Sequence, residues 1–209
     1  MQRKYNPEQT LEKILTVSYD LFSEKGYDKT SMQDIVNALG MSKGAIFHHF
    51  KSKDDIFDGV MNKLAQEMLE QFKTMLAGDL QGLSAKEKLT NLIRFSIDEN
   101  KLSNFLISRT KDPKVLLGLM QLNMRMSSPL AVGVLREGIK DGSITTEHPE
   151  QCAEVIISLL NIWCDRTLFA CDEITFISRI KYLQHALKLL GADIISDDLI
   201  KKLCDTNCP

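Results

Sequence analysis

The sequence predicts an all-α protein, and three observations support this fold class. The 209 residues include only five prolines and eleven glycines, so few residues interrupt a helix. Apolar residues recur at intervals of three and four along most of the chain, which is the spacing of one helix face. No segment alternates apolar and polar residues for long enough to favour a strand.

Composition narrows the class of protein further. Hydrophobic residues make up 44% and charged residues 26%, which is ordinary for a globular chain that buries its own core. There is no stretch of about 18 apolar residues and no apolar signal core near the N-terminus, so we expect a cytoplasmic protein. The five cysteines are odd in number and lack zinc-ligand spacing, which predicts neither a disulfide framework nor a metal site.

The first helix has clear start and stop signals. Asn6 is a good N-cap, and Pro7 suits the first helical position. Apolar residues between Leu11 and Phe22 then form a stripe at helical spacing. We expect Gly26 to end this helix in a left-handed conformation.

Two short helices follow the first one. Ser31 and Asp34 have capping-box spacing at the start of a second helix, which Gly40 ends. Ser42 can cap a third helix that runs to about Phe50. Two short helices joined by a glycine-containing turn have the layout of a helix-turn-helix, although an ordinary three-helix packing unit would share it.

The second helix of a helix-turn-helix inserts its N-terminal end into the major groove of DNA. The residues around the third predicted helix suit that position. Hydroxyl and amide groups at its start can meet a phosphate, small residues allow close approach, and basic residues follow. In particular, Ala45 could touch a thymine methyl group. The predicted DNA contacts are Ser31, Ser42, Lys43, Gly44, Ala45, Phe47, His48, His49, Lys51 and Lys53.

These residues resemble a known family. The run Gly44-Ala-Ile-Phe-His-His-Phe-Lys-Ser-Lys53 is similar to the recognition-helix signature of the tetracycline-repressor (TetR) family. Phe22, Gly26-Tyr27, Thr30 and Ile35 also match the first two helices of that family. The resemblance covers roughly residues 10 to 60, and the rest of the chain resembles the family only in length and helical content.

Two features depart from what a DNA-binding member of that family would have. The family usually has a tyrosine, which commonly donates a hydrogen bond to a phosphate, where this chain has Phe47. Phenylalanine cannot donate, so that contact must come from His48 or be lost. In addition, residues 1–60 contain eight Lys/Arg and nine Asp/Glu, so the basic residues must gather on one face if the domain binds DNA.

Further helices are expected beyond the helix-turn-helix. A long helix begins after Ser52 and extends to about Ala77, and others cover about 85–101, 104–110, 113–140, 149–170 and 173–190. We expect a break or kink before Pro129, and a short helical turn with a frayed tail in residues 193–209. By resemblance, residues 1–52 form the helix-turn-helix DNA-binding domain, and residues 53–209 form a ligand-binding and dimerisation domain.

The helix predicted at 149–170 is apolar on nearly every face, so we expect it to be buried on two sides. One side would face its own core and the other a second subunit. The predicted dimer contacts are Ile156, Leu160, Ile177 and Ile180. The predicted ligand-pocket residues are Phe72, Phe95, Phe105, Met120, Met124, Asn161 and Trp163, with plain core packing as the alternative for each. Cys164 and Cys171 are either buried structural thiols or a redox sensor.

The resemblance implies a ligand-responsive transcriptional regulator, most simply a repressor. It would bind a palindromic operator as a homodimer and be released by a small, largely apolar effector. No cofactor is expected. An enzyme is disfavoured because the sequence has no nucleophile–base arrangement and no glycine-rich phosphate loop. A helical interaction module that has lost DNA binding is the remaining alternative.

Overall fold

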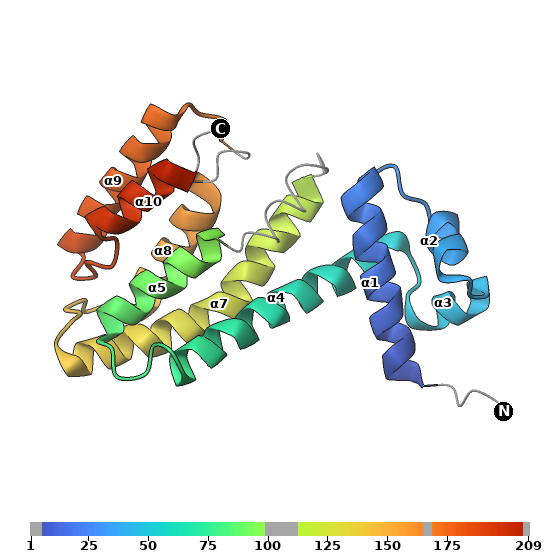
Figure 1. Ribbon diagram of the computed structural model, residues 1–209, viewed down its shortest axis with the longest axis horizontal. Helices are drawn as coiled ribbons and strands as arrows, with labels where there is room; N and C mark the ends of the chain where they lie inside the picture. The colour runs from blue at the N-terminus through green and yellow to red at the C-terminus, as the bar shows by residue number, and fades with distance from the viewer. Residues whose placement is uncertain (1–5, 99–112, 165–168, 207–209) are drawn as a thin grey trace. The chain divides into compact units, whose positions relative to one another are not determined.

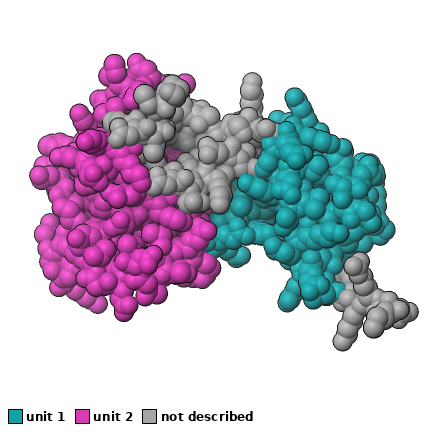
Figure 2. All heavy atoms as spheres, viewed as in Figure 1, with its two compact units in different colours: residues 1–67, 101–116 teal, residues 68–100, 117–209 magenta. Residues whose placement is uncertain are grey.

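The computed structural model describes residues 6–98, 113–164 and 169–206, and these residues form helices and no strand (Figure 1). The all-α fold class is therefore confirmed. Two compact units are present, one of residues 1–67 and 101–116 and the other of residues 68–100 and 117–209 (Figure 2). The functional division predicted at residue 52 stays a prediction. The helix expected at 104–110 lies outside the described residues.

The first unit contains three predicted helices and the start of a fourth. They are α1 (Pro7–Lys25), α2 (Met32–Leu39), α3 (Lys43–His49) and the first part of α4 (Lys53–Ala77). The predicted caps are present at each start. The Asn6 side chain accepts from two backbone N–H groups, Ser31 completes a capping box with Asp34, and Ser42 accepts from the backbone N–H of Ala45 at 3.3 Å.

The glycines that end the first two helices adopt different conformations. Gly40 has φ 60° and ψ 28°, which is the left-handed conformation that only glycine adopts readily. Gly26 has the expected positive φ of 88°, but its ψ of 152° lies outside the left-handed helical region. The sequence therefore identified both helix ends but not the geometry of the first one, because the chain extends directly into the buried Tyr27.

The core of the first unit is built from aromatic rings and isoleucines. The rings of Phe22, Tyr27 and Phe57 pack together, with centroids 4.8 to 5.8 Å apart. Four isoleucines have no exposed surface, and burying each stabilises the fold by about 1.5–3 kcal/mol. These are Ile14, Ile35, Ile46 and Ile56. Each helix of the unit therefore contributes at least one fully buried anchor.

The second unit is made of longer helices around one core. Besides the end of α4, it contains α5 (Ala85–Asp98), all but the first four residues of α7 (Pro113–Asp141), α8 (Pro149–Ser158), the π-helix η1 (Leu159–Trp163), α9 (Glu173–Leu189) and α10 (Asp197–Thr206). Its core includes Leu135, Ile144, Leu183, Leu187 and Ile194, all at most 2% exposed. No helix among the described residues is long and apolar enough to cross a membrane.

Helix α7 runs through the exposed Pro129 without the expected break, and a kink there stays a prediction. Two other expectations for the second unit were wrong. The α-helix that begins at Pro149 ends at Ser158 and continues as η1, rather than extending to 170. A ten-residue helix, α10, replaces the expected short turn, since Leu199 and Ile200 are buried. The tail expected after it falls on residues 207–209, outside the described residues.

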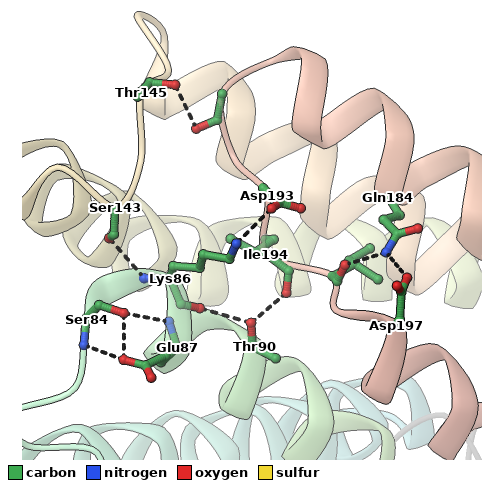
Figure 3. A network of polar contacts seen from close by, with 12 residues as sticks. Ser84, Lys86, Glu87, Thr90, Ser143, Thr145, Gln184, Asp193, Ile194 and Asp197 are labelled. Atoms are coloured by element: carbon green, nitrogen blue, oxygen red, sulfur yellow. Dashed lines mark hydrogen bonds and ion pairs between the residues drawn. The ribbon is translucent and has the colours of Figure 1, made fainter.

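Polar contacts connect α5 to two linking segments of the second unit (Figure 3). The backbone N–H of Lys86 donates to Ser143 Oγ at 3.3 Å, and the Lys86 ammonium pairs with Asp193 at 2.7 Å. The Thr90 hydroxyl donates to the carbonyl of Ile194 at 2.7 Å. This network satisfies backbone groups between helices, so we interpret it as structural.

Candidate nucleic-acid interface

Helix α3 is held by one buried residue and leaves its other faces open. Ile46 is completely buried, whereas Lys43, Gly44, Phe47 and His48 are exposed. A Cβ atom placed on Gly44 would meet nothing within 4 Å, so the backbone of the first turn is open to a ligand. This arrangement presents the N-terminal half of α3 to the outside, as a helix that reads DNA requires.

Two side chains on the exposed face of α3 contact one another. The ammonium of Lys43 lies 5.4 Å from the centroid of the Phe47 ring, within the range of a cation–π interaction. Phe47 is 39% exposed, which is high for a phenylalanine. The rings of His48 and His49, the two residues after Phe47, lie edge to face at the C-terminal end of the helix.

The segment after α3 places one basic side chain outside and another partly inside. Lys51 is exposed, and its backbone N–H donates to Asp55 at 2.9 Å. Lys53 is half-buried, because its ammonium donates to the carbonyl of Tyr27 at 2.8 Å and lies 4.1 Å from the centroid of the Tyr27 ring. The hydroxyl of Tyr27 in turn donates to the carboxylate of Asp54.

The contact between Lys53 and Tyr27 could not be predicted from the sequence. From the sequence, Lys53 is expected only as a DNA contact, and Tyr27 only as part of the resemblance to the TetR family. The nearest signal in the sequence was the aromatic residue directly after the helix-ending Gly26. A DNA contact by Lys53 stays a prediction, and its ammonium would have to share donors between Tyr27 and a phosphate.

Ser31, the first of the predicted DNA contacts along the chain, forms its hydrogen bonds at the start of its own helix. Its backbone N–H and hydroxyl both donate to Asp34, at 2.8 and 2.5 Å, and the hydroxyl accepts from the Asp34 N–H. The Ser31 hydroxyl, its backbone N–H and nearby Lys25 together lower the pKa of Asp34 to about 2. Ser31 therefore fixes the start of α2, and a DNA contact by its side chain stays a prediction.

Comparison with known proteins agrees with this geometry. Residues 14–60 match the family model described as bacterial regulatory proteins of the tetR family. This range contains α2, α3 and most of α1. The chain belongs to the TetR family.

Among relatives of this TetR-family chain, the transcriptional repressor KstR2 of Rhodococcus jostii is 28% identical over 141 residues, which span 64% of this chain and 67% of KstR2. The uncharacterised regulator YvdT of Bacillus subtilis is 36% identical over 114 residues, or 53% of each chain. By name, both relatives are helix-turn-helix transcriptional regulators.

Solved structures extend the likeness to both units of the TetR-family chain. A TetR-family regulator from Mesorhizobium loti has a TM-score of 0.67 at 19% identity, and covers 90% of this chain and 100% of its own. RolR in complex with its ligand resorcinol has a TM-score of 0.65 at 15% identity, and covers 97% of this chain and 96% of its own. At these identities the likeness shows the fold alone.

The ligand-pocket residues predicted for this TetR-family protein lie in several places. The rings of Phe72 and Phe95 contact each other edge to face, with centroids 5.9 Å apart. Met120 and Met124 are half-buried on α7, and Asn161 donates to the carbonyl of Ile157. Phe105 lies outside the described residues.

A hollow of about 610 Å³ opens between α7 and α8. Met124 is the predicted pocket residue that lines it, together with apolar Pro129 and Val132. Charged side chains surround these residues, including Arg136, which forms an ion pair with Glu150. The hollow therefore combines a small apolar patch with a polar rim.

Trp163 lies at the end of η1 in a separate cluster. The guanidinium of Arg179 donates to the carbonyls of Trp163 and Phe169, each at 3.1 Å, and to the sulfur of Cys171 at 3.5 Å. Cys164 is buried beside this cluster, and burial raises the pKa of its thiol to about 11. A thiol with so high a pKa is a poor nucleophile, which favours the structural interpretation of Cys164.

The predicted dimer residues face the core of their own subunit. Ile156 and Ile180 are 5% and 3% exposed within the core of the second unit, and Leu160 and Ile177 pack against that core. Helices α8 and α9 also expose other apolar side chains. Val155 on α8 is 36% exposed, and Ile174 and Leu189 on α9 are 80% and 75% exposed.

Proposed function

We propose that this chain is a ligand-responsive transcriptional repressor that binds a palindromic operator as a homodimer. The observation that carries the proposal is the open N-terminal half of α3, which is anchored by Ile46 and presents Lys43 and Gly44. A major groove accepts a helix presented in this way. The repressor name of KstR2 supports the direction of regulation.

Dimerisation is proposed through α8 and α9. The turns of α9 bring Ile174, Tyr182 and Leu189 to one side of the helix, and all three are at least 67% exposed. Large apolar side chains at such exposure mark surfaces that other molecules cover. A second copy of the same surface, related by a twofold axis, would cover them and leave Ile156 and Ile180 in the subunit core.

The effector is proposed to bind in the second unit. The hollow beside Met124 has a volume in the range of small-molecule sites, and its apolar patch and charged rim suit a small, largely apolar molecule with one polar group. The structure of RolR with resorcinol supports the chemical class, since resorcinol is a small aromatic ring with hydroxyl groups.

Helix α4 is proposed to transmit the signal. It is one continuous helix of 25 residues, and its residues belong to both compact units. A ligand that favours one tilt of α4 would change the separation of the two recognition helices in the dimer. Shifting the equilibrium from 1:99 to 99:1 requires that the ligand prefer one state by about 5.5 kcal/mol.

The proposal is tested by selecting duplexes from a random library with the purified protein and measuring their affinity by fluorescence anisotropy at two salt concentrations. We expect tight, salt-sensitive binding to one palindromic sequence and weak binding to a scrambled duplex. Lys43→Ala should cost about 1–3 kcal/mol of binding free energy if its side chain reaches a base. Enrichment of no sequence, even at low salt, would instead favour a helical interaction module.

The oligomeric state needs its own measurement. We expect the protein to sediment as a dimer and Ile174→Asp to sediment as a monomer, because a buried charge without a partner opposes association. Leu83→Asp is the matched control, since it also replaces an exposed apolar side chain (37%) by aspartate but lies outside α8 and α9. A wild-type protein that remains monomeric at micromolar concentration would refute the proposed interface.

A further inference from the structure

Phe47 is the large apolar side chain that α3 leaves exposed, at 39% of its surface. Its ring carries no hydrogen-bond donor or acceptor, so it cannot bind a phosphate oxygen by a hydrogen bond. Its burial against DNA would be favourable only beside an apolar group. The identity of that apolar group follows from where the ring lies on the helix.

The ring of Phe47 leans toward the end of α3 that would enter the groove. Side chains of an α-helix point back toward its N-terminus, so a residue covers the turn before it. The position of the Lys43 ammonium, 5.4 Å from the ring centroid and one turn earlier, agrees with this direction. Gly44 lies in the same first turn and has no side chain to shield the ring.

The apolar group that B-DNA offers in its major groove is the C5-methyl group of thymine, whereas guanine offers two acceptors to a cationic side chain. The separation of the Lys43 ammonium and the ring, 5.4 Å, corresponds to one or two base-pair steps at about 3.4 Å each. We infer that Phe47 and Lys43 form one reading unit, in which the ring contacts a thymine methyl group and the ammonium contacts a guanine one or two steps away.

This inference rests on the proposed DNA-binding function and adds its sequence specificity. Ala45 is the competing candidate for a thymine methyl, but it is half-buried, whereas Phe47 extends further from the helix. A phosphate-facing ring is the second competitor. Each competitor gives a different result when single atoms are removed from the DNA.

The experiment starts from the selected operator and replaces each thymine in turn by uracil, which removes only the methyl group. We expect one thymine in each half-site at which this change weakens wild-type binding by about fourfold, the effect of one buried methyl group. Replacing the neighbouring guanine by 7-deazaguanine should also weaken binding, because it removes one acceptor of the Lys43 ammonium.

Variants then assign the effect to side chains. Phe47→Ala should bind thymine and uracil duplexes equally at that position, and Lys43→Met should lose sensitivity to 7-deazaguanine while keeping the thymine preference. Leu83→Ala removes a side chain of similar exposure, 37%, in the second unit and should keep both preferences. Thermal unfolding of each variant confirms that it is folded.

Three outcomes would overturn the inference while leaving the proposed function standing. The thymine preference could survive in Phe47→Ala, which would assign the methyl contact to Ala45. Phe47→Tyr could tighten binding to every duplex equally, which would place the ring at a phosphate. Finally, wild-type protein could bind the operator with no sensitive thymine, which would remove the methyl contact but leave the proposed function standing. Failure to select any duplex would overturn the function itself, and the inference with it.

Discussion

Gly44→Ala should change the stability of the protein and its affinity for DNA in opposite directions. In the free protein a Cβ atom at this position meets nothing within 4 Å, so the added methyl group costs no packing energy. Alanine loses less backbone entropy than glycine on folding, and the variant should be more stable by about 0.5–1 kcal/mol. For a chain of this size that corresponds to a rise in Tm of about 2 °C.

The same methyl group should weaken DNA binding. If the backbone at Gly44 lies against the duplex, overlap of about 1–3 kcal/mol reduces affinity by roughly fivefold to 150-fold. Urea denaturation and anisotropy with the selected operator measure the two effects. Gly133→Ala on α7 is the matched control, since its Cβ also meets nothing within 4 Å and it should gain stability with unchanged affinity. A Gly44→Ala protein that binds as tightly as wild type would refute the close approach.

Three further changes test the architecture of the first unit. Gly59→Ala should destabilise the protein by about 1 kcal/mol in urea denaturation despite the better helix propensity, because the new Cβ would lie 2.8 Å from a carbon of Leu15. Lys53→Ala should lose about 1–2 kcal/mol of stability in urea denaturation, because it removes the charged hydrogen bond and the ring contact to Tyr27. An unchanged urea midpoint would mean that these contacts contribute nothing to stability. Because its pKa is lowered in the folded protein, the Asp34 carboxylate contributes stability that is complete above pH 3.8 and is lost as the pH falls toward 2. The difference in unfolding free energy between wild type and Asp34→Asn should therefore disappear over that pH interval. An Asp34 carboxyl that titrates near pH 3.8 by NMR would contradict this prediction.

The sequence was sufficient for the first unit because its signals act over short distances. A capping side chain accepts hydrogen bonds from N–H groups at most three residues away, as at Asn6, Ser31, Ser42 and Ser52. The helix starts could therefore be assigned without knowing the tertiary fold. Gly40 likewise marked a turn whose left-handed conformation depends on that residue alone.

In the second unit, the sequence does not reveal which apolar residues are buried. On α9 the sequence gives one broad apolar stripe, yet Ile180 is 3% exposed and Ile174 is 80% exposed. Which of these residues turns inward depends on the neighbours of α9, and no pattern within the helix contains that information. The change from α8 to the π-helix η1 after Ser158 could not be predicted either, since the sequence there remains apolar and typical of a helix.

Charge placement explains how a unit with an acidic balance can still present a DNA-binding surface. Among residues 1–60, several carboxylates are used inside the unit: Asp34 pairs with Lys25 at 3.3 Å, and Asp55 accepts the backbone N–H of Lys51 at 2.9 Å. The side chains of Lys43 and Lys51 stay exposed on and just after α3. Each phosphate that a cation neutralises contributes about −0.9 to the salt slope. If Lys43 contacts a guanine, as inferred above, Lys51 is the cation of this pair that remains for a phosphate, and the Lys43–Phe47 pair would contribute discrimination through base contacts.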